Sequence, residues 1–388
     1  MSDQAMNGTA STAAGASTGD REQTWTVKRC LTWTVNYLAK KGEERPRLAA
    51  EWLMCAATGM KRIELYMSYD RPLSKQELAI MHDGVVARAA GEPLQYITGE
   101  TSFRTLDILC ERGVLIPRPE TELLVEGVIS HLRSHVLGAN PQSSGGRVEL
   151  PWNAEVERVR AAEIAAQRER SSAEDTSAEA HGRTGEDEAA GDAPAPADAA
   201  HGEEPEPRVA RVLEVGCGTG CISLSLAAEL PGRVRCVATD IEPRAVQLAQ
   251  RNRDRLDIPA EAADFREGDL TAPVLSGEQG MFDVLVSNPP YIPSEVMRTL
   301  PYEVAGFEPA LALDGGDDGL AVFRRLLAIA PTMLEPGGLF ACELYEGSLE
   351  RAASLCKAAG MCDVRIVPDL TDRPRFIFAR TARMARRD

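Results

Sequence analysis

The tetrapeptide Asn288-Pro289-Pro290-Tyr291 combines hydrogen-bond acceptors with a stiff backbone. Its two prolines remove two backbone donors and restrict φ, so the carbonyl groups of this segment have nothing local to bond. If the Asn288 side-chain oxygen and the Pro289 carbonyl each accept one N–H, a planar NH2 group is oriented with its π face toward an electrophile. The positive charge that develops on nitrogen is then stabilised. Tyr291 would pack against the planar group.

These four residues are therefore candidates for binding a substrate amide or amine, and Asn288, Pro289 and Tyr291 are candidates for catalysis. The chemistry that they suit is methyl transfer by in-line displacement at a sulfonium carbon, because an amide nitrogen mainly needs orientation and charge stabilisation. A rigid loop after a strand would use the same residues for structure alone. The interpretation therefore depends on a cofactor site elsewhere in the chain.

An acidic, glycine-rich loop upstream is the candidate cofactor site. Its members are Glu214, Gly216, Cys217, Gly218, Thr219 and Gly220. Glycines let the backbone turn sharply and approach a ligand without a Cβ in the way. Asp240 ends the next expected strand, 20 residues after Gly220, where a carboxylate can accept hydrogen bonds from both ribose hydroxyls. The two features together predict a bound nucleoside.

Two nucleoside cofactors fit this pattern. A nicotinamide dinucleotide would place its pyrophosphate on the helix N-terminus. S-adenosylmethionine carries no phosphate, and the acidic Glu214 suits a cationic ligand better, so we expect S-adenosylmethionine. Asp269 could accept a hydrogen bond from the adenine amino group, although a turn would use an aspartate equally well.

From Arg211 onward, short apolar strands alternate with helices, which predicts an α/β fold with a mainly parallel sheet and right-handed crossovers. Strands are expected at RVLEV, VRCVATD, near Ala263, DVLVSN, LFACEL, CDVRIVP and RFIFAR, and helices at 221–230, 243–255, 318–333 and 348–359. The glycine loop follows the first of these strands, at the carboxyl end of the sheet, where open α/β folds bind ligands.

Before this sheet, apolar residues at helical spacing predict a small helical domain from Thr24. Alternation in LQYITGETSF and LDILCERGVLIP predicts a hairpin, and TELLVEGVISHLRSH predicts a helix after the prolines of IPRPETE. The predicted organisation is a disordered tail at 1–23, a helical domain at 24–92, a β-hairpin linker at 93–118, the first catalytic-domain helix at 119–138, an acidic low-complexity insertion at 139–207 and the catalytic α/β domain at 208–388.

Composition limits the partners and the compartment. The net charge of −16 argues against a nucleic-acid partner, but residues 153–208 hold 15 acidic and 6 basic residues, so −9 belongs to one segment and −7 to the rest. No apolar run approaches the ~20 residues that span a bilayer, and the N-terminus lacks signal features, so a cytoplasmic protein is expected. The nine cysteines are scattered without a CxxC pair, and no metal site is expected.

Several segments together resemble the HemK-type glutamine methyltransferases that modify peptide chain release factors. They are EPLQYITGE (92–100), LIPRPETE (115–122), the GCGTG loop, SNPPYI (287–292) and FEPALALDGGDDGL (307–320). The resemblance implies a Rossmann-like, seven-stranded class I methyltransferase domain joined by a hairpin to a helical N-terminal domain for substrate recognition. It also implies that the substrate is the glutamine of a GGQ loop, methylated at its side-chain amide nitrogen.

The residues and the resemblance together give a candidate site. S-adenosylmethionine would be bound by Glu214, Gly216, Cys217, Gly218, Thr219, Gly220, Asp240, Asp269, Leu270 and Asn288, and the glutamine by Asn288, Pro289, Pro290 and Tyr291. Leu270 departs from the family pattern, which often has an aromatic residue at this position. We expect a monomer without a membrane or nucleic-acid partner, whose protein substrate is a release factor.

Three alternatives remain. The NPPY element is shared with adenine-N6 DNA and RNA methyltransferases, which can hold a flipped base with the same residues, and with a ribosomal-protein glutamine methyltransferase. A nucleic-acid enzyme would need a basic and aromatic recognition region, and the only dense arginine cluster is the C-terminal RTARMARRD. The third alternative, a non-catalytic adapter that binds release factor through its helical domain, is disfavoured by the intact glycine loop and NPPY element.

Overall fold

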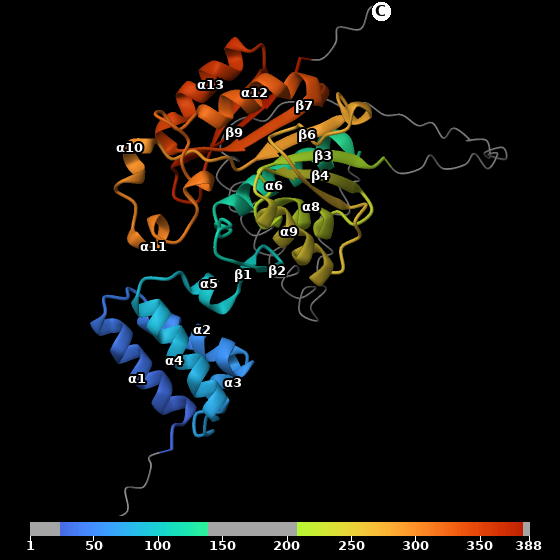
Figure 1. Ribbon diagram of the computed structural model, residues 1–388. Coiled ribbons are helices and arrows are strands. Elements are labelled where there is room, and N and C mark those ends of the chain that lie inside the picture. The colour runs from blue at the N-terminus through green and yellow to red at the C-terminus, as the bar shows by residue number, and fades with distance from the viewer. Residues whose placement is uncertain (1–23, 139–207, 383–388) are drawn as a thin grey trace, which may run out of the picture. The chain divides into compact units, whose positions relative to one another are not determined.

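The structure is a computed structural model that describes residues 24–138 and 208–382, so the predicted tail at 1–23 and insertion at 139–207 lie outside the described residues. The helical domain, drawn in blue in Figure 1, consists of α1 (Val27–Lys40), α2 (Pro46–Thr58), α3 (Arg62–Met67) and α4 (Lys75–Ala89). Leu38, Met54 and Leu65 are buried in its core. Side-chain oxygens of Thr26 and Ser74 cap the first turns of α1 and α4, which satisfies backbone donors there.

The segment after α4 is partly helical. Leu94–Thr98 forms the short helix α5, which starts after Pro93 and ends at Gly99 with a left-handed φ of 82°. The prediction of a strand over LQYIT is therefore wrong, because the proline and glycine at its two ends favour a helical turn over the alternating pattern. The predicted hairpin follows, with β1 (Glu100–Phe103) antiparallel to β2 (Leu106–Leu109).

The second domain contains a seven-stranded sheet in the order β5-β4-β3-β6-β7-β9-β8. Its strands are β3 (Ala210–Val215), β4 (Val234–Asp240), β5 (Ala263–Glu267), β6 (Phe282–Ser287), β7 (Leu334–Glu343), β8 (Cys362–Pro368) and β9 (Pro374–Arg380). All neighbours are parallel except β9, which runs antiparallel to β7 and β8. The predicted Rossmann-like, mainly parallel fold is confirmed.

Helices cover both faces of this sheet. They are α6 (Thr121–His131), α8 (Cys221–Glu229), α9 (Pro243–Arg255), α12 (Ala321–Met333) and α13 (Leu349–Ala358). Figure 1 shows α12 and α13 on one face, and α6, α8 and α9 on the other. The buried side chains of Leu213, Phe323 and Phe340 belong to a hydrophobic core cluster between the sheet and the helices α12 and α13. Two short helices that the sequence pattern did not predict, α10 (Ser294–Met297) and α11 (Tyr302–Ala305), follow β6.

The strand order brings the predicted cofactor and substrate segments together. Strands β3 and β6 are direct neighbours, with β4 beyond β3 and β7 beyond β6, so the winding of the sheet reverses between β3 and β6. The glycine loop follows β3 and Asn288 follows β6, both at carboxyl ends. Open α/β sheets bind their ligands in the crevice at this switch point.

Candidate active site

A cavity of about 730 Å³ opens at the carboxyl ends of β3, β4 and β6. Among the predicted site residues, its lining includes Gly216, Gly218, Asp240, Asp269, Leu270, Asn288, Pro289 and Pro290. The predicted residues outside the lining are Glu214, Cys217, Thr219, Gly220 and Tyr291. An apolar hollow with a few convergent polar groups is the usual form of a small-molecule site.

The glycine loop leaves room for a ligand beside its backbone. Gly216 and Gly218 have left-handed φ values of 77° and 54°. A Cβ at Gly216 would meet no heavy atom within 4 Å, and one at Gly218 would meet only Val114 Cγ1 at 4.0 Å, so the space beside both is open. Asp240 Oδ2 accepts from the Gly218 N–H at 2.9 Å and Oδ1 accepts from the Glu242 N–H at 2.9 Å. Each oxygen keeps a lone pair for a ribose hydroxyl, so these residues fit a nucleoside cofactor.

Three residues of the loop serve its folding. Gly220 packs the start of α8 against the sheet, since a Cβ there would lie 2.9 Å from Phe265 and 3.0 Å from Ala249. Cys217 and Thr219 are 3% and 2% exposed, and burial raises the pKa of the Cys217 thiol. The loop turns these two side chains into the core, so neither residue lines the cavity, and their assignment to the cofactor stays a prediction.

Glu214 is fully buried away from the cavity. Its Oε2 accepts from the Ser223 N–H at 3.0 Å and also from the Ser223 hydroxyl. Burial raises the pKa of Glu214 to about 8, so the neutral form predominates at pH 7. Glu214 is not among the residues that line the cavity, and its interpretation as a negative charge beside a cationic cofactor stays a prediction. This carboxyl anchors the first turn of α8 to β3.

Asp269 and Leu270 form the cavity wall after β5. Asp269 Oδ2 accepts from Arg325 Nη2 at 2.6 Å, which ties the loop to α12. Leu270 has a left-handed φ of 50°, and its carbonyl accepts from Thr239 Oγ1 at 2.7 Å. Leu270 thus offers an apolar surface in the lining, whereas Arg325 is a lining residue that the sequence analysis did not identify.

Asn288 belongs to a hydrogen-bond network that joins three elements. Its Nδ2 donates to Thr121 Oγ1 at 3.0 Å, at the start of α6. The Thr121 hydroxyl donates to Glu343 Oε2 at 2.6 Å, and the Tyr291 hydroxyl donates to Glu343 Oε1 at 2.9 Å. The Tyr291 hydroxyl therefore points to Glu343 on β7, which supplies the partner that such a hydroxyl needs, and the role of Tyr291 beside the substrate stays a prediction. Thr121 and Glu343 were not predicted.

The glycines of ALDGGDDGL explain how the segment after β6 is held. A Cβ at Gly315 would lie 2.7 Å from Tyr291 Cα, and one at Gly319 would lie 2.3 Å from the Tyr291 carbonyl oxygen. The Ile292 N–H donates to the Leu313 carbonyl at 2.9 Å. Only glycine permits such close backbone contact, so this motif supports the chain directly after Pro290.

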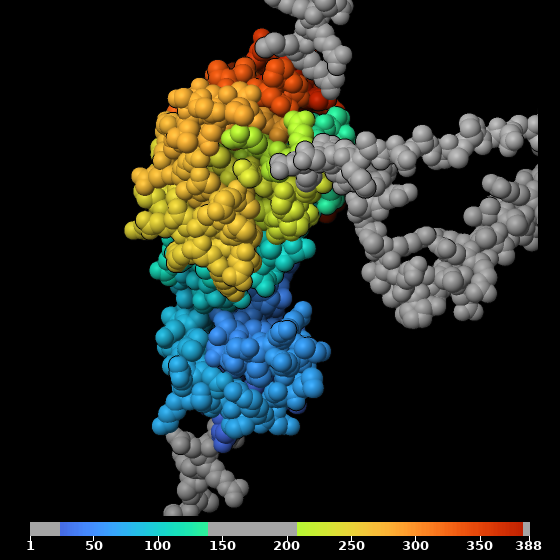
Figure 2. All heavy atoms as spheres, turned by 90° about the vertical axis from the view of Figure 1, so that its right-hand side faces the viewer, coloured from blue at the N-terminus to red at the C-terminus, as the bar shows by residue number. Residues whose placement is uncertain are grey.

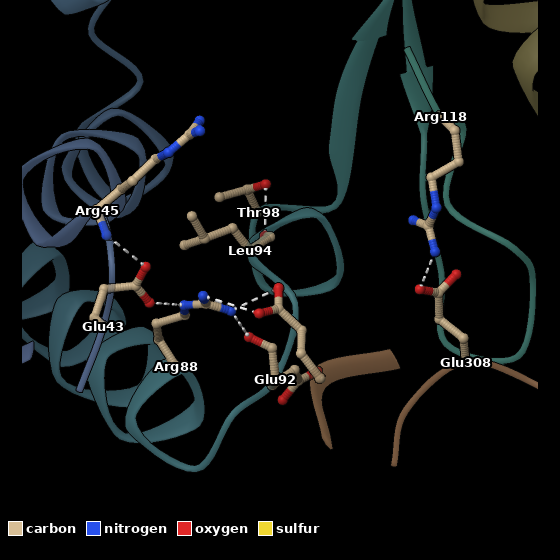
Figure 3. Close-up of polar contacts among 9 residues, drawn as sticks. Glu43, Arg45, Arg88, Glu92, Leu94, Thr98, Arg118 and Glu308 are labelled. Atoms are coloured by element: carbon tan, nitrogen blue, oxygen red, sulfur yellow. Dashed lines mark hydrogen bonds and ion pairs between the residues drawn. The ribbon is translucent and has the colours of Figure 1, made fainter. Parts of the chain in front are cut away.

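A partly buried ion pair connects the IPRPETE and FEPALALDGGDDGL segments. Arg118 Nη2 donates to Glu308, whose side chain is only 2% exposed, and the Ile116 N–H donates to Glu308 Oε2 at 3.3 Å. Figure 3 shows this pair and, as a separate set of contacts, Arg88 donating to Glu43 and to the Glu92 carbonyl. A buried carboxylate is costly without its partner, so Arg118 and Glu308 depend on each other in keeping these two segments together.

Two further findings concern residues 24–138 and 208–382 only. Within them, no three histidine, cysteine, aspartate or glutamate side chains converge in a way that could hold a metal ion. No helix in these two ranges has the length and apolar character needed to cross a membrane.

Comparison with known proteins identifies the family of proteins to which the chain is similar. The family model described as PrmC N-terminal domain matches residues 29–99, and the one described as methyltransferase small domain matches residues 203–300. The release factor glutamine methyltransferase of Geobacter sulfurreducens is 34% identical over 93% of this chain and 99% of its own length. The release factor glutamine methyltransferase of Moorella thermoacetica is 32% identical over 91% of this chain and 98% of its own length. A solved methyltransferase from Pyrococcus furiosus is 23% identical, with a TM-score of 0.34, over 45% of this chain and 77% of its own.

The sheet, the cavity at its switch point and the methyltransferase match define an S-adenosylmethionine-dependent methyltransferase. The N-terminal part of the chain identifies the family more specifically, because the model described as PrmC N-terminal domain matches residues 29–99. The chain belongs to the release factor glutamine methyltransferase family, whose members it matches over nearly their whole length.

Proposed function

We propose that this chain transfers a methyl group from S-adenosylmethionine to the side-chain amide nitrogen of the glutamine in the GGQ motif of peptide chain release factors. The observation that carries the proposal is that Asn288 and Pro289 line the same cavity as the glycine loop, in a chain whose relatives are named for this activity. The sequence-based expectations of a monomer, of a cytoplasmic site of action and of no nucleic-acid substrate belong to the same proposal.

The cofactor half of the cavity would be formed by Gly216, Gly218 and Asp240 around the nucleoside, with Leu270 against the adenine and Asp269 within reach of its amino group. When bound, S-adenosylmethionine supplies an electrophilic methyl group on a sulfonium that becomes a neutral thioether. The open space beside the glycines and the free lone pairs of Asp240 support this assignment.

The acceptor half would orient the substrate amide. Asn288 Oδ1 and the Pro289 carbonyl each accept one N–H of the glutamine NH2, while Pro290 extends the wall beside them. The amide nitrogen lone pair is delocalised, so two fixed acceptors help by turning the π face toward the methyl and by stabilising positive charge on nitrogen. The nitrogen forms its new bond to the methyl carbon and loses one of its two protons to solvent. Tyr291 would pack beside the substrate amide while its hydroxyl donates to Glu343.

The proposal is tested by incubating the full chain with labelled S-adenosylmethionine and either an unmethylated release factor or the same factor with its GGQ glutamine changed to alanine. Mass spectrometry should find one methyl group on the glutamine of the first and none on the second. Label in DNA or RNA would instead support the adenine-N6 alternative, and label in a ribosomal protein would support the related glutamine enzyme. Label in none of them would support the adapter.

A further inference from the structure

The side-chain amide of Asn288 could face the substrate in two ways, and only one of them can work. Its oxygen accepts hydrogen bonds, whereas its NH2 group only donates. A substrate NH2 group also donates, so it needs the oxygen of Asn288 and is repelled by the nitrogen. Something in the site must therefore select one orientation of this amide.

The neighbouring threonine provides that selection. The Thr121 hydroxyl has one hydrogen, which it donates to Glu343 Oε2 at 2.6 Å. Its oxygen then acts as an acceptor toward Asn288, and only the Nδ2 of Asn288 can donate to it, at 3.0 Å. The oxygen of the Asn288 amide is thereby left on the opposite branch of the side chain, and Asn288 is one of the residues that line the cavity.

Glu343 sets the direction of this chain of hydrogen bonds. Its side chain is buried at the end of β7, and both of its oxygens accept, one from Thr121 and the other from the Tyr291 hydroxyl. Two accepted hydroxyl hydrogens match an ionised carboxylate. Burial is the largest influence on the pKa of Glu343 and raises it, the two hydroxyl hydrogen bonds and the charge of Arg375 on β9 lower it, and Glu120 raises it.

We infer that Thr121 and Glu343 are positioning residues, which hold the Asn288 amide with its oxygen toward the substrate nitrogen. This inference rests on the proposed function, since it needs an NH2 group as the acceptor of the methyl.

Protonation of Glu343 would reverse the direction of these hydrogen bonds. The protonated acid donates to Thr121, the Thr121 hydroxyl then donates to Asn288, and the Asn288 NH2 faces the substrate. Activity is therefore lost as the pH falls through the pKa of Glu343, which burial raises above its ordinary value.

The test compares T121V, which keeps the shape but removes the acceptor, with T121S, which keeps the hydroxyl. T332V on the exposed face of α12 is the matched control. At saturating cofactor, T121V should lower kcat for the release factor about 10- to 100-fold, while T121S should stay within about threefold of the wild type. Calorimetry should give all three variants a cofactor Kd within about twofold of the wild type.

A second measurement does not depend on the folding of T121V. The wild-type kcat should fall on the acid side with one ionisation, and E343Q should lack that limb because glutamine does not titrate. Equal kcat for T121V and the wild type, or an unchanged acid limb in E343Q, would overturn the inference while leaving the proposed function intact. A wild-type chain that is inactive on release factor would overturn the proposed function as well.

Discussion

The two halves of the cavity position their ligands by different means. The cofactor half relies on the backbone of Gly216 and Gly218 and on the Asp240 carboxylate, which lies 22 positions from Gly218 in the sequence. The acceptor half relies on Asn288, whose partner Thr121 lies 167 positions away, and on Glu343, which lies 222 positions from Thr121. Cofactor binding is thus largely a local property of two neighbouring strand ends, whereas the acceptor geometry depends on α6, β6 and β7, which Figure 1 labels and which come from distant parts of the sequence. Figure 2 draws the same chain as spheres, with the same colours along the sequence.

The largest expected effect lies in the acceptor half. N288A removes one of the two acceptors for the substrate NH2, so kcat should fall about 100- to 1000-fold, as for the loss of one preorganised polar group in other active sites. Because the cofactor is bound mainly by the other half, its Kd should change by less than about twofold. Initial rates at saturating cofactor and calorimetry measure the two quantities. If N288A weakened cofactor binding as much as it lowered kcat, the two halves of the cavity would not act separately.

In the cofactor half, a substitution is expected to weaken cofactor binding and to leave kcat nearly unchanged. D240A removes two acceptors that serve the ribose and also the partner of the Gly218 N–H, so the cofactor Kd should rise about 10- to 100-fold. Once the cofactor is saturating, kcat should remain within about threefold of the wild type. D254A, an exposed carboxylate on α9, is the control. An unchanged Kd with a reduced kcat would place Asp240 in the acceptor half instead.

A smaller effect is expected on stability. The pKa of Glu214 is raised by burial to about 8, so between pH 5 and pH 8 the folded chain keeps a proton that the unfolded chain loses. Its contribution to the free energy of unfolding therefore falls as the pH rises, by at most about 1.4 kcal/mol per pH unit. E214Q should remove this part of the slope in urea unfolding at pH 5.5, 6.5 and 7.5. Identical slopes for the two proteins would mean that Glu214 is ionised in the fold.

The smallest expected effect concerns the same residue and the cofactor. Because burial raises the pKa of Glu214 to about 8 and the residue lies outside the cavity lining, E214Q should change the cofactor Kd at pH 7 by less than about twofold. Calorimetry measures this directly. A tenfold or greater rise in the cofactor Kd would mean that Glu214 is charged and interacts with the cofactor.

Much of the fold was predictable, because apolar periodicity distinguishes strands from helices. The helix over 243–255 and all seven strands of the large sheet were located in this way. The cofactor loop was also predictable, since glycines after a strand and an aspartate after the next one are local signals. The helix over Leu94–Thr98 was missed because its alternating pattern is typical of a strand.

The acceptor half was only partly predictable. Asn288 and Pro289 were identified from residue type, but the direction of Tyr291 and the burial of Glu214 depend on which side of a strand end each one faces. Thr121 lies in the LIPRPETE segment, but nothing in that segment marks it as a partner of Asn288, and Glu343 belongs to none of the quoted motifs. Only the packing of α6 against β7 brings the two residues together. Such contacts between distant segments are not encoded by any short pattern in the sequence.

The account is tested most directly by a crystal structure of the chain with S-adenosylhomocysteine and a GGQ-containing release factor. We predict that the glutamine Nε2 lies about 2.7–3.2 Å from both Asn288 Oδ1 and the Pro289 carbonyl oxygen, with the sulfur of the cofactor product on its π face. The account is contradicted if Asn288 presents its nitrogen to the glutamine, or if the glutamine binds away from these two oxygens.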